Sequence, residues 1–169
     1  MSAKRQKLFF FFALLVTTLC MPHVGHSGSK PKKTTPQSVQ DRAESGNAAA
    51  QYKLGSMYET GLGFPQNYDE AAYWYRSAAQ QGHPDAQYSL GRLLAMGKGV
   101  SQNYFESYLW LNLAASKTPS EKFVRARDQA ARFMRPRELA EAQEQSVLCL
   151  RSDYVNCYRP RGLRDLRRN

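Results

Sequence analysis

The chain has 169 residues, of which 24 are Lys or Arg and 14 are Asp or Glu, giving a formal net charge of +10 at pH 7. This length is enough for one compact domain. Outside the N-terminal signal region the sole histidine is His83, in a predicted turn before Pro84, where we expect it to be exposed. This distribution excludes an HExxH zinc helix, which needs two histidines, and argues against a Ser-His-Asp triad.

Residues 1–27 have the form of a secretory signal peptide. Three basic residues precede the apolar run Leu8–Met21, and small and polar residues follow it. The run of 14 residues fits the apolar region of a signal better than a membrane-spanning helix, which needs about 20 residues. We expect cleavage after Ser27 and export to a bacterial periplasm or secretion. The alternatives are an uncleaved membrane anchor and, for a eukaryotic protein, the endoplasmic-reticulum lumen.

Residues 28–40 follow the signal and show no apolar periodicity. They contain two prolines, Pro31 and Pro36, among polar residues and lysines. Such a composition is typical of a flexible linker, so we expect a tether here and a folded domain over residues 41–150.

The domain repeats itself at an interval of 36 residues. Overlaying residues 43–79 on 79–115 gives 16 identities in 37 positions, against roughly two for unrelated segments. Apolar residues within one unit follow helical spacing, and a Gly-x-Gly turn divides each unit in two. Each unit is therefore predicted to be a helical hairpin, with four helices at about 47–60, 67–81, 84–96 and 103–116.

Small residues recur at fixed places in the predicted helices. Gly55 and Gly91 fall inside helices, where each costs roughly 1 kcal/mol relative to Ala unless close packing compensates. We expect the pairs Ala78-Ala79 and Ala114-Ala115 to face them, with Trp74, Trp110, Tyr58 and Tyr75 as packing residues rather than a stacking platform for nucleic acid or sugar.

The repeated residues are similar to the Sel1-like repeat, a relative of the tetratricopeptide repeat. The first unit carries the pattern in Ala50, Leu54, Gly55, Tyr58, Gly61, Gly63, Gln66, Asn67, Tyr68, Glu70, Ala71, Trp74, Tyr75, Ala78, Ala79 and Gly82. The second unit is the looser copy, with Leu94 in place of Tyr58 and Ser107 in place of Ala71. The resemblance implies an all-α solenoid that holds other proteins together, as in bacterial envelope and secreted proteins and in an adaptor of endoplasmic-reticulum degradation. It implies no shared catalytic residues and no cofactor.

Two further amphipathic helices, Glu121–Met134 and Arg137–Leu150, are predicted after the repeats. They are separated by Pro136. In the second of them we expect Leu139, Ala142 or Gln143, and Val147 to share the buried face. Both helices are interpreted as caps that close the end of the solenoid.

Cys149 and Cys157 remain as an even pair once Cys20 leaves with the signal. In an oxidising compartment such a pair predicts a disulfide, which would fold the chain back after the last helix and hold Leu148 and Tyr154 near the cap. Metal ligation is disfavoured because a tetrahedral zinc site needs four ligands and no histidine lies nearby.

The last 19 residues, 151–169, form a basic tail with a net charge of +4. Its candidate contacts to an anionic lipid surface, lipopolysaccharide or an acidic protein are Arg159, Arg161, Arg164, Arg167 and Arg168. A merely solubilising role is the alternative, and nucleic acid is a poorer partner for an exported chain.

The candidate binding residues lie on the first helix of each hairpin, because first helices line the concave surface in related folds. Spacing of four and three residues puts them on one stripe: Tyr52, Ser56 and Glu59 in the first unit, and Tyr88, Arg92 and Ala95 in the second. Met96 is a further variable position there. The identity of Tyr52 and Tyr88 leaves packing as their alternative role.

The sequence therefore predicts a non-catalytic scaffold that binds a protein or an extended peptide in its concave face. An anionic-surface binder is the first alternative. A hydrolase of cell-wall substrates is a weaker one, since no nucleophile and base can be paired. The sequence does not specify an oligomeric state.

Overall fold

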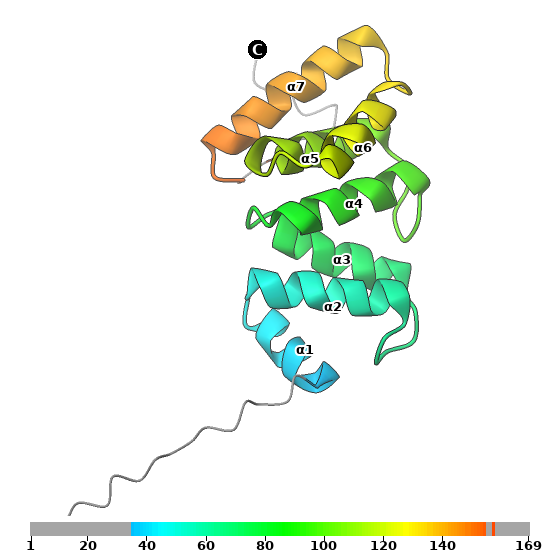
Figure 1. Cartoon of the computed structure of the whole chain (residues 1–169), viewed down its shortest axis with the longest axis vertical. Helices are drawn as coiled ribbons and strands as arrows, with labels where there is room; N and C mark the ends of the chain where they lie inside the picture. Colours follow the sequence, from blue (N-terminus) through cyan, green and yellow to red (C-terminus); the bar gives the residue numbers. More distant parts are fainter. Residues whose placement is uncertain (1–34, 155–156, 158–169) are drawn as a thin grey trace, which may run out of the picture. The chain divides into compact units, whose positions relative to one another are not determined.

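Residues 35–154 and residue 157 are described by the computed structural model and belong to one compact unit. They form seven helices and no strand: α1 (Pro36–Glu44), α2 (Ala48–Thr60), α3 (Tyr68–Ala79), α4 (Pro84–Met96), α5 (Tyr104–Lys117), α6 (Glu121–Ala131) and α7 (Pro136–Arg151). Each helix from α1 to α5 packs on the next, and both α6 and α7 pack on α5 (Figure 1). The predicted all-α solenoid of helical hairpins is confirmed. None of these seven helices is long and apolar enough to cross a membrane.

Both second helices of the repeats begin after Asn, and both first helices end at Gly, at positions 36 residues apart. Asn67 and Asn103 cap α3 and α5, and their side-chain oxygens accept backbone N–H groups of the first turn. Gly61 and Gly97 end α2 and α4 in the left-handed conformation, at φ +78° and +66°. The same local signals therefore produce the same hairpin twice.

Two buried glutamines join each repeat to the helix before it. Gln51 Nε2 donates to the carbonyl of Ala43, and Gln87 Nε2 donates to the carbonyl of Ala79, each at 3.1 Å. Both acceptors are carbonyls in the last turn of a helix, which lack a partner within the helix itself. These side chains therefore provide a hydrogen bond to a backbone carbonyl at the end of one helix and also hold the next helix against it.

The two helical glycines permit close helix contact, but with other partners than the sequence suggested. A Cβ added at Gly55 would lie 2.7 Å from Cδ1 of Tyr75, and one at Gly91 would lie 2.7 Å from Cγ of Leu111. The expectation that the alanine pairs face these glycines is wrong. Large side chains of the second helix fill the space that the missing Cβ leaves. Ala78 and Ala79 are buried in the main core cluster, and Ala114 and Ala115 are buried in a smaller cluster with Phe123.

The tether predicted over residues 28–40 is too long, because α1 begins within it. Thr35 and Ser38 cap this helix reciprocally: each side-chain oxygen accepts the other residue's backbone N–H. Val39 and Ala43 are its buried residues, and they join the core of the first hairpin. Residues 28–34 and the predicted signal lie outside the described residues.

Helix α7 closes the hairpin stack, with a different buried face from the predicted one. Val147 and Leu148 are exposed at 48% and 51%, so the expected burial of Val147 is wrong. The helix is rotated so that its buried face consists of Ala142, Gln145, Ser146 and Cys149. This rotation places Cys149 in the main core cluster beside Trp110.

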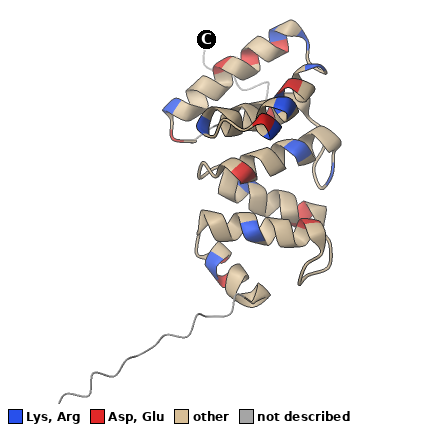
Figure 2. Ribbon diagram, viewed as in Figure 1, with Lys and Arg blue, Asp and Glu red and all other residues tan. Residues whose placement is uncertain are grey.

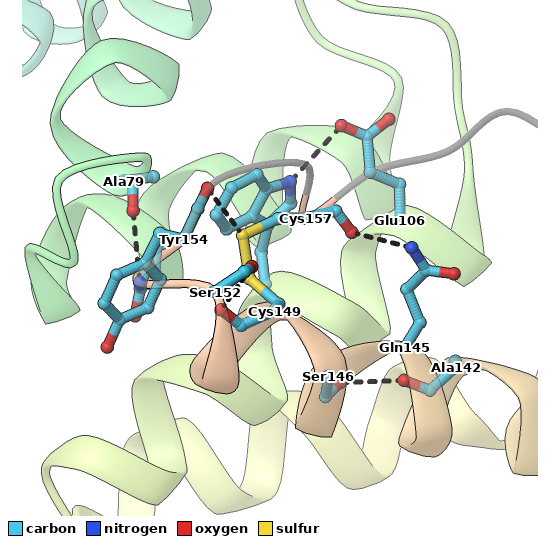
Figure 3. Close-up of a disulfide and its surroundings, with 11 residues drawn as sticks. Ala79, Glu106, Ala142, Gln145, Ser146, Cys149, Ser152, Tyr154 and Cys157 are labelled. Carbon is cyan, nitrogen blue, oxygen red and sulfur yellow. Dashed lines mark hydrogen bonds between the residues drawn. A yellow bond between two sulfur atoms is a disulfide. The ribbon is translucent and has the colours of Figure 1, made fainter.

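A disulfide joins Cys149 to Cys157 and holds the turn after α7 against the repeats (Figure 3). Both cysteines are buried, and Gln145 Nε2 donates to the carbonyl of Cys157 at 3.3 Å. The ring of Tyr154 covers the α3–α4 turn, since a Cβ at Gly82 would lie 2.6 Å from its Cε2. The bridge therefore connects the end of the fold to the junction of the two repeats.

Reducing this disulfide is expected to lower the free energy of unfolding by about 2 kcal/mol, because it releases a short closed loop in the unfolded chain. Urea unfolding followed by circular dichroism with and without dithiothreitol measures the difference. The control is the double variant Cys149→Ala and Cys157→Ala, whose unfolding should not respond to reductant. Equal midpoints for the oxidised and reduced wild-type protein would contradict the prediction.

Candidate protein-binding face

The six predicted binding residues lie on α2 and α4, and all six are partly buried. We call the surface built from α2, α4 and α6 the first-helix face, since α2 and α4 are the first helices of the two hairpins and α6 packs against α4. Its predicted members are Tyr52, Ser56 and Glu59 on α2 and Tyr88, Arg92 and Ala95 on α4. The structure directly joins Glu59 to Arg92. Binding by these residues remains a prediction.

Glu59 connects the two helices through a short hydrogen-bonded network. One carboxylate oxygen accepts the hydroxyl of Tyr75 at 2.7 Å, and the other forms an ion pair with Arg92 Nη2. Burial, followed by the hydrogen bond to Glu59, raises the pKa of Tyr75. The Glu59 side chain is 17% exposed and that of Arg92 is 40% exposed. Glu59 therefore orients a guanidinium group that solvent and a ligand can still reach.

Both repeated tyrosines pack against aromatic neighbours. Tyr52 stacks on His83, with ring centroids 4.8 Å apart, and Tyr88 lies 5.1 Å from Phe123 of α6. Lys122 Nζ lies 5.2 Å above the ring of Tyr88. These contacts give the tyrosines a packing role, although each retains some exposed surface.

A pocket of about 270 Å³ opens between α4, α5 and α6. Its wall includes the stacked rings of Tyr104 and Phe133, whose centroids are 4.6 Å apart. Phe133 is 61% exposed and Met96 is 43% exposed. The complete lining is Arg92, Ala95, Met96, Tyr104, Leu111, Ala126, Gln129, Ala130 and Phe133. Two predicted residues, Arg92 and Ala95, therefore line an apolar pocket.

Sequence reasoning missed the contribution of α6 to this pocket. Ala126, Ala130 and Phe133 occur at intervals of four and three residues, so the spacing was visible in the sequence. The sequence predicts a cap for this segment because no third copy of the repeat covers it. In the structure α6 lies against α4 and α5 and extends the first-helix face beyond the second repeat.

His83 is not the exposed turn residue that the sequence suggested. It is the N-cap of α4, where its Nδ1 accepts the backbone N–H of Ala86 at 3.4 Å, and it is partly buried under Tyr52. Burial lowers its pKa below the ordinary 6.5, while Asp85 acts in the opposite direction.

The unfolding free energy is therefore expected to decrease as pH falls below about 6.5, because the unfolded chain takes up a proton on His83 before the folded protein does. The test compares urea unfolding at pH 7 and pH 5 with that of His83→Asn. The control variant His83→Asn should still cap α4, because asparagine is the N-cap at the equivalent position of the first repeat. There Asn47 accepts the N–H of Ala50 at 2.9 Å. An identical pH dependence in both proteins would contradict this role.

The charges of the described part cancel. Residues 35–154 contain 13 Lys or Arg and 13 Asp or Glu, so the net charge of +10 belongs entirely to residues 1–34 and 155–169. Figure 2 shows acidic and basic residues interspersed along the helices. The five candidate arginines, Arg159, Arg161, Arg164, Arg167 and Arg168, lie outside the described residues. Within the described part, no group of three or more His, Cys, Asp or Glu side chains is placed to hold a metal ion.

Comparison with known proteins identifies the repeats. The Sel1 repeat family matches residues 48–83 and 84–118. No curated protein is significantly similar to the chain in sequence. Similar solved structures include a protective antigen of uropathogenic Escherichia coli with an SLR fold, at 25% identity and a TM-score of 0.67 over 72% of this chain. A Sel1 repeat protein from Oxalobacter formigenes is 32% identical over 48% of this chain, with a TM-score of 0.48.

This chain matches only part of each of these two proteins. The chain spans 26% of the length of the Escherichia coli antigen and 63% of the Oxalobacter protein. Sel1 repeat proteins generally act as protein-interaction scaffolds. Residues 48–83 and 84–118 of this chain are therefore two Sel1 repeats, and α6 and α7 follow them.

Proposed function

We propose that the protein is an exported, non-catalytic scaffold that binds another protein or an extended peptide on its first-helix face. The observation that carries this proposal is the pocket beside Arg92, which is apolar, open and built by three helices of a repeat fold. Repeat proteins commonly use such helix-lined surfaces for recognition. The signal-like residues 1–27 support export, and N-terminal sequencing of the mature protein should begin at Gly28.

Site-specific photo-crosslinking in cells tests the binding face. We expect benzoylphenylalanine at Ser56 or Ala95 to capture the same discrete protein, because both positions lie on the first-helix face. The matched control is benzoylphenylalanine at Ala140, an exposed position of α7. Equal capture from Ala140, or different proteins from the two face positions, would contradict the proposal.

An anionic surface bound through the C-terminal arginines is the second candidate. It is supported by the cancellation of charge within residues 35–154, which concentrates the positive charge in the terminal segments. Such binding weakens with salt because mobile ions screen it. Association with anionic vesicles that disappears both in high salt and on truncation after Tyr158 would favour this candidate. Association that survives truncation would exclude it.

A further inference from the structure

We propose that the pocket between α4, α5 and α6 binds one large apolar side chain of an extended peptide, and that Arg92 binds an acidic side chain next to it in that peptide. This inference rests on the proposed function and specifies the chemistry of the partner. A single peptide would then use both properties of the pocket, its apolar wall and the cationic side chain at its edge.

The size of the pocket favours a side chain over a free small molecule. Its volume of about 270 Å³ lies at the lower limit of the range of about 300–1,000 Å³ that is usual for small-molecule sites. The exposed ring of Phe133, supported by Tyr104, forms one wall, and Met96 from α4 adds a flexible thioether that adapts to different apolar shapes. A Leu, Met or Phe side chain would cover surface that is otherwise exposed to water.

The charge of the lining favours an acidic neighbour. Arg92 is the one ionisable cation among the nine lining residues, and no Asp or Glu is among them. Glu59 pairs with one nitrogen of Arg92 from the α2 side, outside the lining. This pair orients the guanidinium group, which has five N–H donors and can bind a second carboxylate.

The backbone around the pocket favours an acidic side chain over a free C-terminus. Eight of the nine lining residues lie within α4, α5 or α6, where most backbone N–H groups are used by the helices. Sites for a C-terminal carboxylate typically use free backbone N–H groups. Recognition of the anion therefore depends on the Arg92 side chain, and Gln129 can bind the peptide backbone.

The experiment selects peptides from a phage-displayed random 12-residue library on the full chain with its disulfide intact. Selected peptides are synthesised with blocked ends, and their affinities are measured by calorimetry. We expect a Leu, Met, Phe or Trp within two positions of an Asp or Glu. Arg92→Gln and the pocket-filling Ala126→Phe should each weaken binding at least tenfold. The matched controls on α7, Arg137→Gln and Ala140→Phe, should leave affinity unchanged.

A cycle of substitutions identifies the ion pair. Replacing the acidic residue of the peptide by its amide should weaken binding to the wild-type protein but not to Arg92→Gln. Selected peptides without an acidic residue, affinity that is insensitive to Arg92→Gln, or a requirement for a free C-terminal carboxylate would each overturn the inference. Failure to enrich any peptide would also count against it. The photo-crosslinking experiment is independent of these results, so a partner captured from Ser56 and Ala95 would leave the proposed function standing.

Discussion

Trp110→Ala is expected to lower the free energy of unfolding by about 3–5 kcal/mol, the range for removing a fully buried aromatic side chain. Trp110 is 1% exposed and lies in the main core cluster with Cys149 and Cys157. Its Nε1 also donates to Glu106 at 3.2 Å, so the substitution removes a partner from a buried carboxylate.

The repeat supplies a matched control for this substitution. Trp74 occupies the same position of the first unit but is partly exposed at the edge of a smaller core cluster. Trp74→Ala should therefore cost at least about 1 kcal/mol less than Trp110→Ala, since less apolar area leaves water on folding. Urea unfolding followed by far-ultraviolet circular dichroism compares the two variants. An equal loss in both would contradict the assignment of Trp110 to the central core.

Gly99→Ala is expected to destabilise the fold by about 2–4 kcal/mol through two separate effects. Gly99 has φ +65°, a conformation that residues with a Cβ rarely adopt. An added Cβ would also overlap the carbonyl group of Tyr68 and lie 2.6 Å from the backbone nitrogen of Asp69. Because both neighbours are backbone atoms at the start of α3, relief requires moving the loop between α4 and α5.

Gly46→Ala isolates the conformational part of that cost. Gly46 also has a positive φ, of +90°, but nothing lies within 4 Å of an added Cβ. It should cost about 1–2 kcal/mol from backbone conformation alone. Chemical unfolding of both variants gives the difference, which measures the contact with α3. If Gly99→Ala were no more destabilising than Gly46→Ala, the close approach of this loop to α3 would be refuted.

The repeat hairpins were predictable because local signals agreed with the tertiary contacts. Asparagine caps, glycine ends and helical spacing recur together, so both ends of each of the four repeat helices were placed within two residues. Helix α1 was missed because its apolar residues are limited to Val39 and Ala43. A nine-residue segment of this kind becomes stable by packing on α2, a contact that local sequence does not encode.

The candidate site was predictable in part. Spacing identified the stripes on α2 and α4, and the structure joins them through Glu59 and Arg92. The pocket could not be predicted because it depends on how α6 packs. Phe133 lies just beyond the end of α6 and stacks on Tyr104, a contact between residues 29 positions apart in the sequence. The rotation of α7 was likewise determined by its packing on α5 and by the buried Cys149.

The first-helix face has two kinds of surface, which differ in what a substitution would change. The tyrosines on α2 and α4 are held by aromatic neighbours, so changing them would alter packing as well as recognition. Arg92 is partly exposed and contacts one acidic partner, so changing its charge alters recognition with less effect on the core. Arg92 is therefore the most informative position for a binding test.

The most direct test of the binding face is the affinity of the crosslinked partner for two charge-exchange variants, measured by calorimetry. Glu59→Arg with Arg92→Glu reverses the ion pair on the first-helix face, and Arg137→Glu with Glu141→Arg reverses an exposed pair on α7. Both exchanges preserve net charge, and circular dichroism checks that each variant is folded. We predict at least a tenfold loss of affinity, about 1.4 kcal/mol, for the first exchange and none for the second. Unchanged affinity in the first variant, or an equal loss in both, would contradict binding on the first-helix face.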